Sequence, residues 1–270
     1  MDLLSIFGYI GALVIGISLG LIGGGGSILA VPILAYLFHL DARLATAYSL
    51  FIVGASAAIG GWRQARNGQV DWRTAVVFGL PAIAGVWVIR HYVVPALPDV
   101  LFTLGGFDVT RRMLMFGLFA LLMLLAAFSM LRGGKREGGT GEVRYNYPLI
   151  LAEGIVVGAI TGFVGAGGGF LIIPALVVLA NLDIKRAIGT SLVIIAIKSL
   201  MGFFLGDALG GDLDIDWTFL AVFTGLSFAG IFIGTWLGTM VDGQKLKKGF
   251  GYFILAMAIF VFVMEFVVKA

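Results

Sequence analysis

Apolar residues occur in ten long runs along the chain, separated by short polar stretches. The runs cover residues 3–22, 27–38, 44–62, 74–95, 112–131, 148–164, 169–181, 187–205, 217–240 and 249–268. They are apolar on every side, whereas strands of a membrane barrel alternate between polar and apolar residues. A membrane-spanning helix needs about 20 mostly apolar residues. The pattern therefore predicts an all-α polytopic membrane protein with eight to ten membrane segments.

Two of these runs, 27–38 and 169–181, are too short to span a bilayer upright. Each follows a glycine cluster at which the chain can turn sharply. The clusters are Gly23, Gly24, Gly25 and Gly26 in one case, and Gly165, Ala166, Gly167, Gly168 and Gly169 in the other. We therefore expect a glycine-broken helical hairpin at each cluster, with short helices that begin at Ser27 and Gly169.

The two halves of the chain are repeats. Aligning Pro32 with Pro174 gives an offset of 142 residues and 14 identities over positions 16–50 without a gap. Chance matching of glycine and leucine does not explain this agreement, because the rarer proline and the aspartates Asp41 and Asp183 also coincide. We expect a first transmembrane repeat at 1–131, a cytoplasmic linker at 132–147 and a second transmembrane repeat at 148–270.

The charges predict that the repeats are inverted. The loop after the first-half run 44–62 contains Arg63, Arg66 and Arg73, whereas the matching second-half stretch, 206–216, contains four aspartates and no base. Lysine and arginine are favoured on the cytoplasmic side of a membrane. The two loops should therefore lie on opposite sides of the bilayer.

Inverted repeats with glycine-interrupted segments at matching positions are typical of secondary transporters. Unwound backbone inside a membrane is tolerated where it is buried in protein or lines a cavity. A helix that begins after such a turn presents N–H groups, which attract anions. The alternative is that the glycines only allow helices to pack closely.

Hydroxyl groups follow each hairpin at matching positions. Tyr48 and Ser49 begin the next helix of the first half, and Thr190 and Ser191 occupy the equivalent positions of the second half. These hydroxyls are candidates for hydrogen bonds to substrate oxygens. The alternative is that they bond to the backbone of their own helix.

Lys198 lies in the middle of the apolar run 187–205. An ionisable residue inside a membrane is a functional candidate by default. It is a candidate counter-charge for an anion, or a group that loses its proton during transport. The alternative is a lysine that snorkels or that pairs with an acid such as Asp207. Glu265 lies near a run end, where we expect an interfacial position.

Composition agrees with this interpretation. Hydrophobic residues make up 60% of the 270 residues and charged residues 12%, against about 45–50% and 25% in soluble domains. The chain has no cysteine, and its basic residues are scattered, so we expect no nucleic-acid partner. It contains none of the H-E-x-x-H or G-x-S-x-G enzyme motifs. We expect no enzyme activity, no cofactor and no metal.

Several motifs resemble those of the TauE/SafE family of sulfite exporters, also called TSUP. They are G-L-I-G-G-G-G-S-x-L-x-V-P at 20–32, R-N-G-Q-V-D-W at 66–72, G-x-x-T-G-F-V-G-A-G-G-G-F-L-I-I-P at 158–174, and D-I-K-R-A-I-G-T-S-L at 183–192. The resemblance implies a multi-pass protein of the bacterial inner membrane. It also implies a small sulfur-containing anion as substrate, such as sulfite, sulfoacetate or another organosulfonate.

We therefore expect a secondary transporter that exports such anions by alternating access, with protons or sodium ions as candidate coupling ions. The expected substrate-binding residues are Gly23, Gly24, Gly25, Gly26, Ser27, Tyr48, Ser49, Gly165, Gly167, Gly168, Gly169, Thr190, Ser191 and Lys198. An uncoupled anion channel with the same site is the alternative. A membrane enzyme is a third hypothesis, but the sequence contains no convincing pair of a nucleophile and a base.

Overall fold

The computed structural model describes residues 3–104, 107–132, 147–165, 168–178, 182–209 and 213–268. The helices of the first half are α1 (Leu3–Ile22), α2 (Gly26–Pro32), η1 (Ile33–Leu37), α3 (Ala42–Arg66), α4 (Trp72–Val88), η2 (Ile89–Val93), α5 (Val94–Ala96) and α6 (Arg111–Arg132). Those of the second half are α7 (Tyr147–Val164), α8 (Gly169–Val178), α9 (Ile184–Met201), η3 (Gly202–Ala208), α10 (Trp217–Met240), α11 (Gly243–Val263) and η4 (Met264–Val268). The predicted all-α fold is confirmed.

Six helical segments of the described chain are long and apolar enough to cross a membrane. They are Ala42–Arg66, Trp72–Ala96, Arg111–Arg132, Ile184–Ala208, Trp217–Met240 and Lys248–Val268, and the shorter apolar helices are Phe7–Ile22, Gly26–Leu37 and Pro148–Val164. The expected linker at 132–147 lies outside the described residues except for its two ends.

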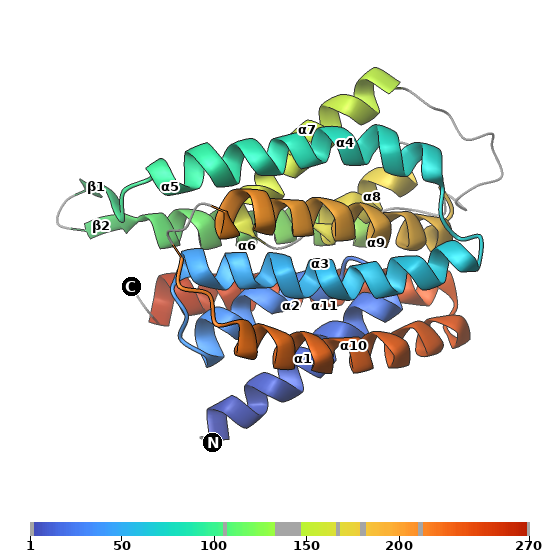
Figure 1. The fold of residues 1–270 in the computed structure, drawn as a ribbon, viewed down its shortest axis with the longest axis horizontal. Helices are drawn as coiled ribbons and strands as arrows, with labels where there is room; N and C mark the ends of the chain where they lie inside the picture. The colour runs from blue at the N-terminus through green and yellow to red at the C-terminus, as the bar shows by residue number, and fades with distance from the viewer. Residues whose placement is uncertain are drawn as a thin grey trace.

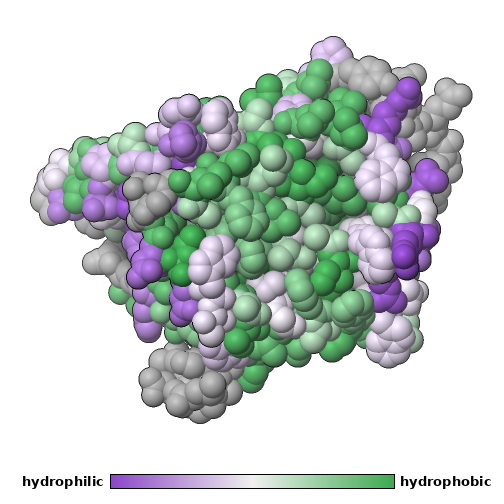
Figure 2. Space-filling view, viewed as in Figure 1, coloured by the Kyte–Doolittle hydropathy of each residue, from purple (hydrophilic) through white to green (hydrophobic). Residues whose placement is uncertain are grey.

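The helices run roughly along one direction and form a bundle with two ends (Figure 1). Figure 2 shows a broad band of hydrophobic residues across one face, with hydrophilic residues gathered at both ends. Trp62, Trp72, Trp217 and Trp236 are all more than half exposed and lie near helix ends, where tryptophans anchor membrane helices. The hydrophobic band is therefore the surface that faces lipid.

The two ends of the bundle differ in charge. One end, called the basic end below, contains the last turn of α3 with Arg63 and Arg66, and the first turn of α9 with Lys185 and Arg186. The other end, called the opposite end, contains the starts of α3 and α10 (Figure 1). The positive-inside tendency predicts that the basic end faces the cytoplasm.

The packing of the helices is symmetric between the two halves. α1 packs along α10 and α7 packs along α4, while α3 contacts α9 and α6 contacts α11 at the interface of the halves. If each helix is replaced by its equivalent in the other half, the α1–α10 pair becomes the α7–α4 pair, and the α3–α9 and α6–α11 pairs become themselves. In Figure 1, α3 and its repeat equivalent α9 run in opposite directions, and the connections after α3 and before α10 lie at opposite ends. Inverted repeats require equivalent helices to run in opposite directions, as α3 and α9 do. The inversion itself stays a prediction.

Glycines bring the crossing helices into backbone contact. A Cβ added to Gly16 of α1 would lie 2.0 Å from the carbonyl oxygen of Ser227 in α10, and one added to Gly158 of α7 would lie 2.2 Å from that of Ala82 in α4. Gly16 and Gly158 are repeat equivalents. Close approach at small residues drives helix association in lipid, so some of the glycines serve tight packing, as the alternative reading expected.

A small β-hairpin at the opposite end was not predicted. Strand β1 (Val100–Leu104) pairs antiparallel with β2 (Phe107–Thr110) between α5 and α6. In the first half, the hairpin lengthens the connection that follows α4.

Candidate functional site

The two glycine turns meet at the centre of the bundle. A Cβ added to Gly24 would lie 2.0 Å from the carbonyl carbon of Gly169, so only glycine permits this approach. Gly23, Gly165 and Gly168 adopt positive φ angles of 74°, 71° and 69°, which glycine adopts at little cost. The turns of the two repeats are thus in direct contact, and no solute fits between Gly24 and Gly169 themselves.

The first residues of the short helices are buried and closely packed. α2 begins at Gly26, one residue before the expected start, and α8 begins at Gly169 as expected. The Ser27 hydroxyl donates a hydrogen bond of 2.6 Å to the carbonyl oxygen of Gly24. A Cβ on Gly26 would lie 2.2 Å from the carbonyl oxygen of Ile15, and one on Gly25 would lie 2.9 Å from Ser18 Oγ. Gly167 lies outside the described residues.

Ser49 and Ser191 are both buried but differ in their hydrogen bonding. The Ser191 hydroxyl donates to the carbonyl oxygen of Ile188 at 2.8 Å, and it lies 3.0 Å from the position of a Cβ on Gly23. The Ser49 hydroxyl has no hydrogen-bond partner within the described part of the chain. A buried unpaired polar group costs about 1–3 kcal/mol. Ser49 therefore has hydrogen-bonding capacity available to a ligand.

Tyr48 and Thr190 connect the two halves. The Asp216 backbone N–H donates to the Tyr48 hydroxyl at 2.6 Å, and the Asp71 backbone N–H donates to the Thr190 hydroxyl at 2.9 Å. Asp71 and Asp216 are the N-cap residues of α4 and α10. Each hydroxyl thus holds the start of a helix that belongs to the other repeat.

We expect Tyr48→Phe and Thr190→Val each to lower the free energy of unfolding by about 1–2 kcal/mol, because each leaves a backbone N–H without its acceptor. Thermal and denaturant unfolding in detergent measures the change, with the exposed Tyr252→Phe as the matched control. A large loss of substrate affinity at unchanged stability would instead place these hydroxyls in the binding site.

Lys198 is buried in the core beside the second glycine turn. Its Nζ atom donates to Thr161 Oγ1 at 2.6 Å, and a Cβ on Gly168 would lie 2.8 Å from the same Nζ. Its side chain is 1% exposed. Within the described residues no carboxylate forms an ion pair with Lys198. The alternative pairing with Asp207 is therefore wrong, because Asp207 has another partner.

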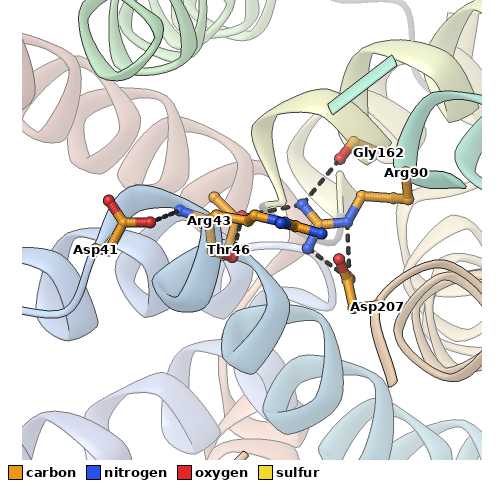
Figure 3. A network of polar contacts seen from close by, with 6 residues as sticks. All are labelled: Asp41, Arg43, Thr46, Arg90, Gly162 and Asp207. Carbon is orange, nitrogen blue, oxygen red and sulfur yellow. Dashed lines mark hydrogen bonds and ion pairs between the residues drawn. The ribbon is translucent and has the colours of Figure 1, made fainter. Parts of the chain in front are cut away.

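That partner is Arg90, and the pair lies buried near the opposite end of the bundle (Figure 3). Arg90 Nη2 and Nε donate to Asp207 Oδ2 at 2.5 and 2.8 Å, and both side chains are at most 1% exposed. Arg90 Nη1 donates to Thr46 Oγ1 at 2.9 Å and reaches the carbonyl oxygen of Gly162 at 3.5 Å. Figure 3 shows the Arg43 side chain extending from α3 toward the same pair.

The sequence analysis did not select Arg90 or Asp207 as site residues. Arg90 lies within the apolar run 74–95, so the rule that selected Lys198 applies equally to it. The Arg90 network also touches the second glycine turn, because a Cβ on Gly165 would lie 2.1 Å from the Cβ of Thr46.

A polar cavity of about 230 Å³ opens at the basic end. Its lining comes from α1, the α3–α4 connection, α9 and α10. The lining residues are Gly20, Leu21, Gln64, Asn67, Gln69, Lys185, Ile188, Thr235, Gly238 and Thr239. Ile188 also approaches the first glycine turn, 3.1 Å from a Cβ placed on Gly23. Ile188 is thus a shared wall between the cavity and the first glycine turn.

Two further arginines at the opposite end are paired with acids. Arg111 Nη2 lies 2.7 Å from Asp99 Oδ1, and Arg112 Nε lies 2.8 Å from Glu265 Oε1. Glu265 is only 2% exposed and also accepts from the Tyr36 hydroxyl at 3.2 Å, so its carboxylate is buried in the bundle, while its interfacial depth stays a prediction. Each ion pair is close to neutral as a whole, which explains why these arginines occur at the end that the positive-inside tendency disfavours.

An all-helical bundle with a lipid-facing band, glycine-broken hairpins and a buried lysine defines a multi-pass membrane transporter. The sulfite exporter TauE/SafE family matches residues 9–261. The chain belongs to this family, and it is a membrane transporter rather than an enzyme.

Curated relatives have the same general description. A "Probable membrane transporter protein" of Xylella fastidiosa (strain 9a5c) is 33% identical over 92% of this chain and 90% of its own length. A protein of the same description from Haemophilus influenzae is 24% identical over 94% of this chain and 96% of its own. The "Probable membrane transporter protein YdhB" of Bacillus subtilis is 26% identical over 91% of both. No solved structure matches the chain.

Proposed function

We propose that this protein exports small sulfur-containing anions, such as sulfite or a short organosulfonate, across the bacterial inner membrane by coupled alternating access. The observation that carries the proposal is Lys198, a buried cation with a hydroxyl as its hydrogen-bond partner and no carboxylate paired with it among the described residues. A charge in a low-dielectric interior needs a counter-charge or must be neutralised. A transported anion would supply that counter-charge.

The groups around Lys198 suit an oxyanion. Thr161 lies beside the ammonium group, and Ser49 is a buried hydroxyl without a partner in the described structure. Ser191 precedes Lys198 by seven residues, nearly two helical turns, so it shares a face of α9 with the lysine. Hydroxyl and ammonium groups can donate hydrogen bonds to sulfite or sulfonate oxygens.

The polar cavity supports the exporting direction. It opens at the basic end, which the positive-inside tendency assigns to the cytoplasm. An anion in the cytoplasm would therefore enter through it. The printed description of the family, "Sulfite exporter TauE/SafE", supports the substrate class.

Transport into proteoliposomes tests the proposal. The purified protein is reconstituted, and the flux of sulfite, sulfoacetate, sulfate, phosphate and chloride is measured with and without a proton or sodium gradient. We expect sulfite or sulfoacetate flux to exceed phosphate and chloride flux, and to increase with one of the two gradients. Sulfur-anion conduction that no gradient drives would indicate the channel instead, and absence of flux for every sulfur anion would contradict the proposal.

A further inference from the structure

The polar cavity at the basic end and the Arg90 network at the opposite end occupy equivalent positions of the two repeats. The offset of 142 residues pairs Gly20 with Gly162, Lys185 with Arg43, and Ile188 with Thr46. Arg90 and Thr235 also correspond, because each follows the N-cap aspartate of its helix, Asp71 or Asp216, by the same distance in sequence. One member of each pair lines the cavity, namely Gly20, Lys185, Ile188 and Thr235. The other member belongs to the Arg90 network or, for Arg43, extends toward it: Gly162, Arg43, Thr46 and Arg90.

The two positions differ in the group that fills them. At the basic end, Thr235 leaves a cavity of about 230 Å³, which is several times the roughly 30 Å³ that a water molecule occupies in the liquid. At the opposite end, the larger Arg90 side chain occupies the equivalent place and is 1% exposed. Its guanidinium joins Asp207, Thr46 and Gly162, which belong to η3, α3 and α7. The same part of the repeat is therefore open at one end and closed at the other.

We propose that the Arg90–Asp207 ion pair is a gate that closes the path to the opposite end, while the cavity lined by Lys185 and Thr235 is the open mouth of the same path. This inference rests on the proposed transport function, because it assigns the two mouths of that path. Opening the gate would separate the end of α4 from the end of α9 and its continuation η3, and expose the Gly165 turn and Ser49.

The position of the pair suits this role. It connects a segment of each repeat, because Arg90 follows α4 and Asp207 follows α9. It also contacts the second glycine turn, since Thr46 lies against Gly165. An ion pair can separate and form again without rebuilding a packed apolar core. Alternating access requires such a network to have two discrete arrangements, one with the ion pair formed and one with it separated.

The absence of native cysteine makes the gate directly testable. Ser49→Cys reports access from the opposite end, and Ile188→Cys, at a residue that lines the cavity, reports access from the basic end. Each reporter is reconstituted and treated with a membrane-impermeant thiol reagent on one side. The exposed positions Lys248→Cys and Thr103→Cys, one near each end, establish the orientation of the protein in the vesicles.

With the gate intact, we expect Ile188→Cys to react from the basic end and Ser49→Cys to stay protected from the opposite end. Adding Asp207→Asn to the Ser49→Cys reporter should raise its labelling rate from the opposite end by about tenfold or more, the change that about 1.4 kcal/mol in the gating equilibrium produces. The matched control is Asp99→Asn, which breaks the exposed ion pair with Arg111 at the same end. It should leave the labelling of Ser49→Cys unchanged.

A second variant covers the case in which Asp207→Asn does not fold. Thr46→Val keeps the ion pair and removes the hydroxyl that accepts from Arg90, so we expect a smaller increase of a few-fold. Unchanged labelling in the folded variants, or an equal increase with Asp99→Asn, would overturn the gate. Labelling does not depend on which anion is carried, so a failed sulfite assay with gated labelling would reject the substrate and not the gate.

Discussion

Replacing Lys198 with methionine should reduce the transport of sulfur anions by roughly tenfold to a hundredfold, because a hydrogen bond to a charged group contributes about 1.5–3 kcal/mol. Methionine has a similar length and fills the same volume without the charge. Transport into proteoliposomes measures the effect. The matched control is Lys248→Met, which removes the same charge at an exposed position near the basic end.

Lys198→Met should leave the stability of the protein unchanged or raise it. Replacing a buried charge by an apolar side chain of similar volume is often neutral or stabilising, and the Thr161 hydroxyl keeps its contact with the Gly158 carbonyl oxygen at 3.3 Å. We therefore expect the thermal midpoint to stay the same or rise while transport falls. Full transport in this variant would remove Lys198 from the site, and a large loss of stability would show that the lysine has a structural role.

Replacing Gly24 with alanine should strongly destabilise the protein. The new Cβ would lie 2.0 Å from the Gly169 carbonyl carbon, and backbone atoms cannot move aside as a flexible side chain can. Overpacking of this kind costs about 1–3 kcal/mol and occasionally more. We expect a lower yield of monodisperse protein and a lower thermal midpoint, measured by size-exclusion chromatography and by thermal unfolding.

The control for this variant is Gly225→Ala in α10, where an added Cβ meets nothing within 4 Å. It should be neutral or slightly stabilising, because alanine favours a helix by up to about 1 kcal/mol over glycine. A stable Gly24→Ala protein with normal transport would mean that the two turns separate without loss, contrary to the packing at the centre of the bundle.

The membrane class and the turns could be predicted from the sequence because both are local properties. The length and uniform polarity of the apolar runs identify membrane helices. The glycine clusters mark the turns, and the repeat alignment places the two clusters at matching positions. The structure brings Gly24 of one cluster against Gly169 of the other. Lys198 was selected by the same local logic, since a charge inside an apolar run is costly wherever the run packs.

The Arg90–Asp207 pair could not be derived in this way. Arg90 and Asp207 are separated by 117 residues, and hydrophobicity does not state which apolar segments become neighbours. Tyr48 and Thr190 illustrate the same limit. Their position after the hairpins suggested ligand binding, whereas their partners are the N-cap residues of helices from the other half.

The β-hairpin did leave a signal in the sequence. Val100–Leu104 and Phe107–Thr110 are rich in β-branched and aromatic residues and flank Gly105 and Gly106, a pattern typical of a two-residue hairpin turn. Its two strands are far shorter than an apolar run that spans a membrane, so the pattern that predicts membrane helices does not predict them.

The exchange of partners between the halves has a consequence for biosynthesis. α1 packs on α10, so the segment from Ile22 to Trp217 must be synthesised before α1 can reach its final neighbour. Chains grow from the N-terminus at about 5–20 residues per second, so α1 waits in the bilayer with Gly16 and Gly20 exposed to lipid or to an insertion factor. Neither half should fold stably alone. Two fragments divided within 133–146 and produced together should associate and form the complete bundle.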